Sequence, residues 1–145
     1  MLTPPTPSPH WHATDDAGVS HSSESSAGSW LILYFYPKDD TPGCTIQACG
    51  FQKSSPSFAG RARILGVSRD DQESHVAFRE KYGLGFPLLI DTDGSLHTTF
   101  GVGTDYPKRT TFLIDPTGTI QKIYHGFDCN DHAADLLRGL DELGA

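Results

Sequence analysis

The hydrophobic residues of this chain fall into short runs that resemble buried strands. The run Trp30-Leu-Ile-Leu-Tyr-Phe-Tyr36 is apolar at every position, as expected of a strand buried on both faces, and Pro37 ends it. Shorter runs at 63–68 and 86–91 predict two more strands. Runs at 110–115 and 119–124 flank a tight turn and predict an antiparallel hairpin.

Segments between these strands have the spacing and end signals of helices. They are expected at about 44–58, where Pro56 bends or ends the helix, between Asp70 or Asp71 and Gly83, near 95–100, and after Asn130 or Asp131. In the second of these, His75, Phe78 and Tyr82 recur at helical spacing, and a longer apolar stripe follows in the last. Strands that alternate with helices and end in a hairpin predict an α/β fold of the thioredoxin-like type. We expect one domain with a mixed central sheet and helices on both faces.

Composition and charge narrow the function classes. The chain has 145 residues and a formal net charge of -7, from 11 basic and 18 acidic side chains. This balance argues against nucleic acid or an anionic membrane surface as the main partner. There is no apolar run long enough to span a bilayer and no secretory signal, so the expected location is the cytoplasm.

Three cysteines are an odd number and too few for a disulfide scaffold, which leaves catalytic, redox, metal-binding or incidental roles. Cys44 lies where the buried strand has ended and a helix begins, a place where the helix dipole favours a thiolate. Lowering a thiol pKa from about 8.5 to below about 7 requires roughly 2 kcal/mol, and a helix end supplies about 0.3 to 1 kcal/mol. A nearby cation is therefore needed, and Arg109, just before the strand at 110–115, is the candidate.

The residues around Cys44 suit attack of its sulfur on a peroxide. The Thr41 hydroxyl, three residues earlier, can exchange hydrogen bonds with a bound O–O–H group, and Gly43 lets the backbone approach closely. Attack would leave Cys44 as a sulfenic acid. Cys49 lies five residues later, about 8 to 9 Å away between Cα atoms on an intact helix, which is too far for a disulfide. If Cys49 attacks the sulfenic acid, the first turns of the helix must unwind.

The segment from Tyr34 to Cys49 resembles the peroxiredoxins, specifically the class of peroxiredoxin Q and bacterioferritin comigratory protein. Pro37, Thr41 and Cys44 match the motif Pro-x-x-x-Thr/Ser-x-x-Cys. The resemblance implies a thiol peroxidase for hydrogen peroxide and organic hydroperoxides, with Cys44 peroxidatic, Cys49 resolving, and Arg109 as the active-site arginine. Pro37 and Gly43 would shape the substrate pocket. It also implies thioredoxin or a similar dithiol as reductant, no metal or bound cofactor, and a chain that in this class is often monomeric.

The N-terminal part departs from the usual pattern of that class. Counting back from Trp30 places a hairpin at residues 8–29, with Ser23 and Ser26 where apolar residues are normal. We therefore expect a weakened hairpin at 8–29 within a single domain of residues 8–145. Residues 1–7 are expected to form a flexible tail.

Two other functions fit a thiol-bearing fold of this kind. One is a general thiol–disulfide oxidoreductase, although the usual Cys-x-x-Cys spacing is missing. The other is a redox or zinc-sensing module built from Cys44, Cys49, Cys129 and a histidine, although its ligand spacing is not recognisable. Otherwise Cys129 is interpreted as incidental, and Asp39 and Asp40 as part of a solvated loop.

Overall fold

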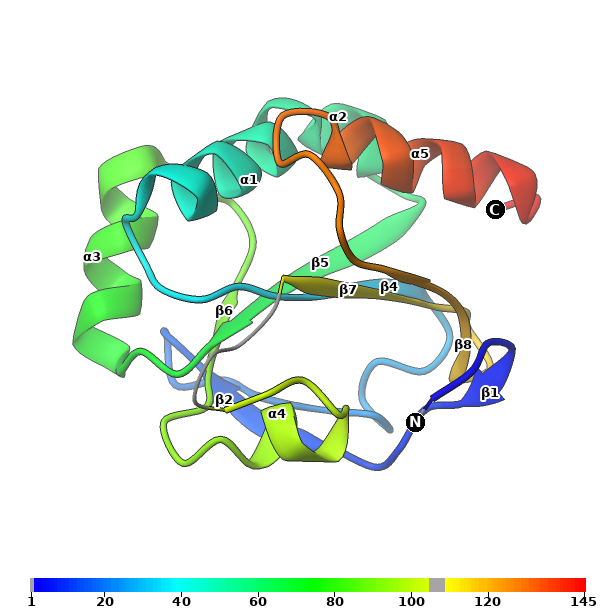
Figure 1. Ribbon diagram of the computed structural model, residues 1–145, viewed down its shortest axis with the longest axis horizontal. Helices are drawn as coiled ribbons and strands as arrows, with labels where there is room; N and C mark the ends of the chain where they lie inside the picture. Colours follow the sequence, from blue (N-terminus) through cyan, green and yellow to red (C-terminus); the bar gives the residue numbers. More distant parts are fainter. Residues whose placement is uncertain (1, 105–108) are drawn as a thin grey trace.

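A computed structural model describes residues 2–104 and 109–145, and within them the chain forms one eight-stranded mixed sheet with helices on both of its faces (Figure 1). The strand order is β1-β8-β7-β4-β5-β6-β2-β3. The strands are β1 (Thr6–Pro7), β2 (His12–Asp15), β3 (Ser20–Ser22), β4 (Trp30–Phe35), β5 (Ala62–Ser68), β6 (Leu88–Ile90), β7 (Thr110–Ile114) and β8 (Thr119–Tyr124). The helices are α1 (Pro42–Lys53), α2 (Ser55–Phe58), α3 (Gln72–Tyr82), α4 (Ser95–Thr99) and α5 (His132–Glu142).

Strand β4 runs through the middle of the sheet and supplies side chains to two separate cores. Its alternate residues point to opposite faces, as the period of a strand requires. Ile32, Tyr34 and the following Tyr36 pack with residues of α1, α2, α3 and α5. Leu31, Leu33 and Phe35 pack with α4 and the N-terminal segment on the other face. The expected mixed sheet with helices on both faces is confirmed.

The pairing of the central strands brings two distant segments of the chain together at one end of the sheet. Strand β4 runs parallel to β5 and antiparallel to β7, with Phe35 opposite Thr110. Arg109 precedes Thr110, so it lies at the end of the sheet where β4 finishes and the loop leading into α1 begins. The segments around Cys44 and Arg109, about 65 residues apart in sequence, therefore meet at this end of the sheet.

Helix boundaries follow the end signals in the sequence. The expected helix at 44–58 is divided into α1 and α2 at Ser54, just before Pro56. The carboxylate of Asp71 accepts a hydrogen bond from the backbone N–H of Ser74 and caps α3, which ends at Gly83 with a left-handed φ of 63°.

The N-terminal segment joins the sheet earlier than the sequence predicts. Residues 6–7, expected in a flexible tail, form β1 by pairing with β8, with Thr6 opposite Ile120. Ser8 continues the contact, because its backbone N–H donates to the Gly118 carbonyl over 2.8 Å. The physical reason is that β8 would otherwise present the unpaired backbone groups of an edge strand. Strands β2 and β3 form an antiparallel hairpin within residues 8–29.

Among the described residues, no helix is long and apolar enough to cross a lipid bilayer.

Candidate active site

Cys44 lies in the first turn of α1 and faces the core. Helix α1 begins at Pro42, so Cys44 is its third residue, and only 1% of its surface is exposed. The first N–H groups of a helix have no acceptor inside the helix and carry the positive end of its dipole. The buried Tyr34 ring lies near this turn: burial raises the pKa of Tyr34 well above its ordinary value, and the charge of Cys44 raises it further. Cys44 therefore lies in the first turn of a helix and belongs to the same buried cluster as Tyr34.

Arg109 contacts the same turn, as the sequence predicts. Its Nη2 lies 2.6 Å from the position that a Cβ on Gly43 would occupy, so the guanidinium rests directly against the backbone of residue 43. Its Nη1 donates a hydrogen bond to Oε1 of Gln47 over 3.0 Å. The structure thus places the Arg109 guanidinium beside the first turn of α1.

Gln47 is a site residue that the sequence reasoning missed. Its side chain is 1% exposed, and it holds Arg109 from inside the helix. The available signal is its spacing: residues three apart on a helix share a face, so Gln47 lies on the same face as Cys44. A polar residue that shares a helix face with a candidate nucleophile indicates a site residue.

Thr41 is the N-cap residue of α1, but its hydroxyl does not cap the helix. The hydroxyl instead donates to the Lys38 carbonyl over 2.9 Å, back into the preceding loop. With its proton engaged there, the oxygen keeps lone pairs that can accept a hydrogen bond from a substrate. Pro37, which follows β4 by two residues, is exposed at the start of the same loop.

The other two cysteines differ in their relation to Cys44. All three are free thiols. Cys49 is half-buried on the same intact helix, where five residues of rise keep it about 8 to 9 Å from Cys44 between Cα atoms. Burial raises the pKa of the Cys49 thiol. Burial also raises the pKa of Cys129, Arg109 lowers it and Cys44 raises it, so Cys129 is within electrostatic range of the site.

The two aspartates of the loop are not both solvated, which corrects the sequence interpretation. Asp40 is exposed, but Asp39 is 7% exposed and is hydrogen-bonded by residues of α3. The reason is tertiary, because α3 lies more than 30 residues further along the chain. Asp39, Asp70 and His75 bring ligand-type atoms within 4.8 Å of one another. Oδ2 of Asp39 already accepts a hydrogen bond from Nδ1 of His75, and Oδ2 of Asp70 accepts one from the backbone N–H of Asp39. We therefore interpret the group as a polar network.

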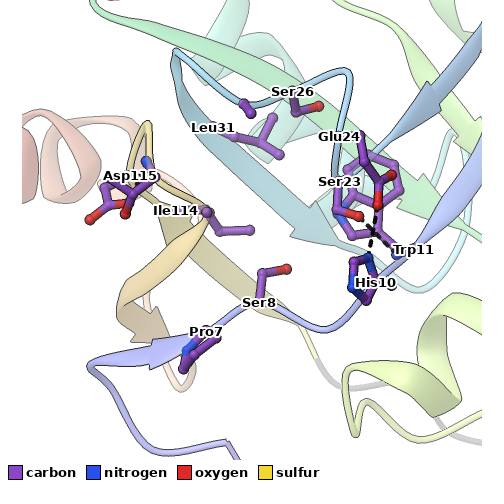
Figure 2. A pocket seen from close by; sticks show the side chains of 13 residues that line it. Pro7, Ser8, His10, Trp11, Ser23, Glu24, Ser26, Leu31, Ile114 and Asp115 are labelled. Carbon is purple, nitrogen blue, oxygen red and sulfur yellow. Dashed lines mark hydrogen bonds and ion pairs between the residues drawn. The ribbon is translucent and has the colours of Figure 1, made fainter.

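Two cavities are relevant to where a ligand could bind. One of about 250 Å³ lies between the N-terminal segment, the loop before β4 and the β7–β8 turn, lined by side chains such as Trp11, Leu31 and Ile114 (Figure 2). Because Leu31 and Ile114 lie at the opposite ends of β4 and β7 from the α1 loop, this cavity is remote from Cys44. A second cavity, of about 1050 Å³, is lined by Arg109 and by apolar residues that include Phe100, Phe112 and Phe127.

Comparisons with known proteins agree on one family. The AhpC/TSA family model matches residues 5–123. The chain is 41% identical to peroxiredoxin Bcp of Bacillus subtilis, over 88% of both chains, and 38% identical to the chloroplastic peroxiredoxin Q of Triticum aestivum, over 93% of this chain and 65% of that one.

Solved structures give the same result. The Xanthomonas campestris bacterioferritin comigratory protein superimposes with a TM-score of 0.87 at 34% identity, covering 93% of this chain and 92% of that one. Peroxidoxin BcpB of Mycobacterium tuberculosis superimposes with a TM-score of 0.91 at 30% identity, covering 99% of each. The chain therefore belongs to the AhpC/TSA family, as a peroxiredoxin of the peroxiredoxin Q and bacterioferritin comigratory protein class, and is a thiol peroxidase.

Proposed function

We propose that Cys44 is the peroxidatic residue and that Arg109 and Thr41 orient the peroxide against it. The observation that carries this assignment is the position of the Arg109 guanidinium, which rests on Gly43 and is held by Gln47 beside the first turn of α1. A cation fixed at this place can donate hydrogen bonds to the peroxide oxygens. Pro37 and Gly43 complete the pocket by shaping the loop and admitting the guanidinium.

In the first step, the Cys44 thiolate attacks the terminal oxygen of a hydroperoxide. A sulfur–oxygen bond forms, the O–O bond breaks, and the electron pair leaves with the alkoxide or hydroxide, which takes up a proton. Cys44 becomes a sulfenic acid, and the product is an alcohol or water. Donors held before the reaction stabilise the developing charge without reorganising, which is why the fixed guanidinium matters.

In the second step, Cys49 resolves the sulfenic acid. The Cys49 sulfur attacks Cys44, a disulfide forms and water leaves. Because the two Cα atoms are about 8 to 9 Å apart on the helix and a disulfide requires less than about 7 Å, the beginning of α1 must unwind for this step. Thioredoxin or a similar dithiol then reduces the disulfide by exchange, which returns both thiols and the helix.

The substrates of the enzyme include hydrogen peroxide and organic hydroperoxides. The chain acts in the cytoplasm as a monomer, and its reaction uses no metal or bound cofactor. The apolar cavity beside Arg109 supports the organic substrates, because it can accommodate an alkyl tail while the O–O–H group meets the guanidinium.

A thioredoxin-coupled assay with hydrogen peroxide and with a bulky hydroperoxide tests this assignment. Cys44→Ser is expected to abolish turnover with both peroxides. Cys49→Ser should keep one round of peroxide reduction and lose thioredoxin-dependent turnover, and the matched control Cys129→Ser should behave as wild type. Turnover that survives in Cys44→Ser would overturn the assignment of the nucleophile.

A further inference from the structure

Two adjacent aspartates tether the loop before α1 to helix α3. On the exposed side, the Asp40 carboxylate accepts hydrogen bonds from Lys81 Nζ and from the Tyr82 hydroxyl, both over 2.7 Å. On the buried side, Asp39 turns toward Ser74 and His75. Asp40 has a left-handed φ of 57°, an uncommon conformation for a residue other than glycine, and it is exposed whereas Asp39 is buried.

The buried tether is a dense set of hydrogen bonds. The Asp39 carboxylate accepts from the Tyr36 hydroxyl over 2.6 Å, from the Ser74 hydroxyl over 2.8 Å and from Nδ1 of His75 over 2.6 Å. Three donors therefore converge on this one carboxylate, whose two oxygens accept all three hydrogen bonds. The other ring nitrogen of His75 faces an acceptor as well, the Leu89 carbonyl at 2.8 Å.

His75 is therefore held as an imidazolium. Both of its nitrogens face acceptors, and only the protonated ring donates from both. Burial by itself lowers the pKa of His75, but the hydrogen bond and charge of Asp39 outweigh it, so the pKa is raised. The charged groups that act on the ring are Asp39 and, more weakly, Asp70. With side-chain exposures of 0% and 3%, His75 and Asp39 form a buried ion pair, and a buried charge that loses its partner is strongly destabilised.

This pair is connected to the reaction site through a single peptide unit. The backbone N–H of Asp39 donates to Oδ2 of Asp70 over 2.8 Å. The carbonyl on the other side of the same peptide bond belongs to Lys38, and it accepts from the Thr41 hydroxyl over 2.9 Å. Because the peptide unit is planar, the orientation of its N–H fixes the orientation of its C=O, and through it the Thr41 hydroxyl.

We infer that Asp39 and His75 are positioning residues for peroxide reduction: their buried ion pair anchors the Asp39 side chain while Asp70 accepts from the Asp39 backbone N–H, and together they keep the Lys38–Asp39 peptide, and so Thr41, in the orientation that receives the peroxide. This inference rests on the proposed function of Cys44 and Thr41. Neither residue touches the substrate. Helix α3 thereby serves as the support for the catalytic loop, although it contributes no residue to the reaction itself.

The test compares two reactions of Cys44, oxidation by hydrogen peroxide and alkylation by iodoacetamide, which does not need the Thr41 geometry. A displacement of about 1 Å in a reacting group can cost up to about a hundredfold in rate, so His75→Ala should slow oxidation by at least about tenfold. Alkylation should be unchanged or faster. His75→Asn, whose amide N–H can take the place of Nδ1 opposite Asp39, should recover part of the rate. Asp40→Asn, which alters only the exposed tether, is the matched control and should oxidise at close to the wild-type rate.

Circular dichroism establishes that each variant is folded, and Ser74→Ala provides a milder loss of the same network if His75→Ala does not fold. The inference is overturned if folded variants of the network react with peroxide within twofold of wild type, if oxidation and alkylation slow by the same factor, or if Asn and Ala at position 75 are equally slow. If wild-type Cys44 itself does not react with peroxide, the proposed function fails and the positioning role fails with it. Normal wild-type oxidation with unaffected variants rejects the positioning role alone.

Discussion

The substitution Gly43→Ala should slow the oxidation of Cys44 by peroxide while it leaves the free energy of unfolding nearly unchanged. Gly43 has no positive φ, so alanine can adopt its backbone conformation. A Cβ there would lie 2.6 Å from Nη2 of Arg109, whereas ordinary contacts begin at 3.4 Å, so the guanidinium must withdraw by at least 0.8 Å (the difference, 3.4 − 2.6). A misplacement of about this size costs about 10- to 100-fold in rate, or about 1.4 to 2.7 kcal/mol in the barrier.

Stability should hardly change, because two small effects oppose each other. Alanine is favoured over glycine in a helix by up to about 1 kcal/mol. Weakening the hydrogen bond between Arg109 and Gln47 costs about 1 kcal/mol. The free energy of unfolding of Gly43→Ala should therefore stay within about 1 kcal/mol of wild type.

Rapid mixing with hydrogen peroxide gives the rate of Cys44 oxidation, and urea unfolding gives the stability. Gly50→Ala, on the same helix, is the matched control, since a Cβ at position 50 meets no atom within 4 Å. It should leave the oxidation rate unchanged and raise stability by up to about 1 kcal/mol. Oxidation of Gly43→Ala within twofold of the wild-type rate would contradict this role of Gly43, as would a loss of stability of more than about 2 kcal/mol, which indicates a folding defect.

Two further substitutions and one oxidation experiment test other parts of the structure. Burial lowers the pKa of His132 from 6.5 to about 4, so the unfolded chain takes up a proton first as the pH falls, and stability should drop by about 3 kcal/mol between pH 6.5 and 4. His132→Asn, which cannot be protonated, should lack this drop in urea unfolding at several pH values. In Gly139→Ala the new Cβ would overlap with the Tyr124 hydroxyl between α5 and β8, so the melting temperature should fall, with a loss of about 1 to 3 kcal/mol. One equivalent of peroxide should produce a Cys44–Cys49 disulfide and a loss of helical circular dichroism, and peptide mapping that finds Cys129 in the bond instead would exclude Cys49 as the resolving residue.

The elements and the location of the site could be predicted because they depend on local patterns. The apolar run at 30–36 predicts β4, and Pro56 predicts the break between α1 and α2. Cys44 at the end of a strand and the start of a helix requires a cation, and the structure places Arg109 against that turn.

The features that escaped prediction depend on segments distant in sequence. Nothing near Asp39 shows that Ser74 and His75 will bury it, since that contact requires α3 to fold against the loop. In the same way, Thr6 and Pro7 have the composition of a tail, but the open edge of β8 recruits them into the sheet. Gln47 lies between these cases, because its helical spacing from Cys44 is local but its contact with Arg109 is not.

The most direct test that the Cys44 sulfur reduces the peroxide is mass spectrometry of Cys49→Ser after treatment with one equivalent of hydrogen peroxide. Without Cys49, the sulfenic acid of Cys44 cannot be resolved within the helix and should accumulate, aided by a trapping reagent specific for sulfenic acids. We expect the peptide that contains Cys44 to gain the mass of one oxygen atom, or that of the trapping reagent. Peroxide consumed with Cys44 unmodified, or with the oxygen found on Cys129, would contradict it.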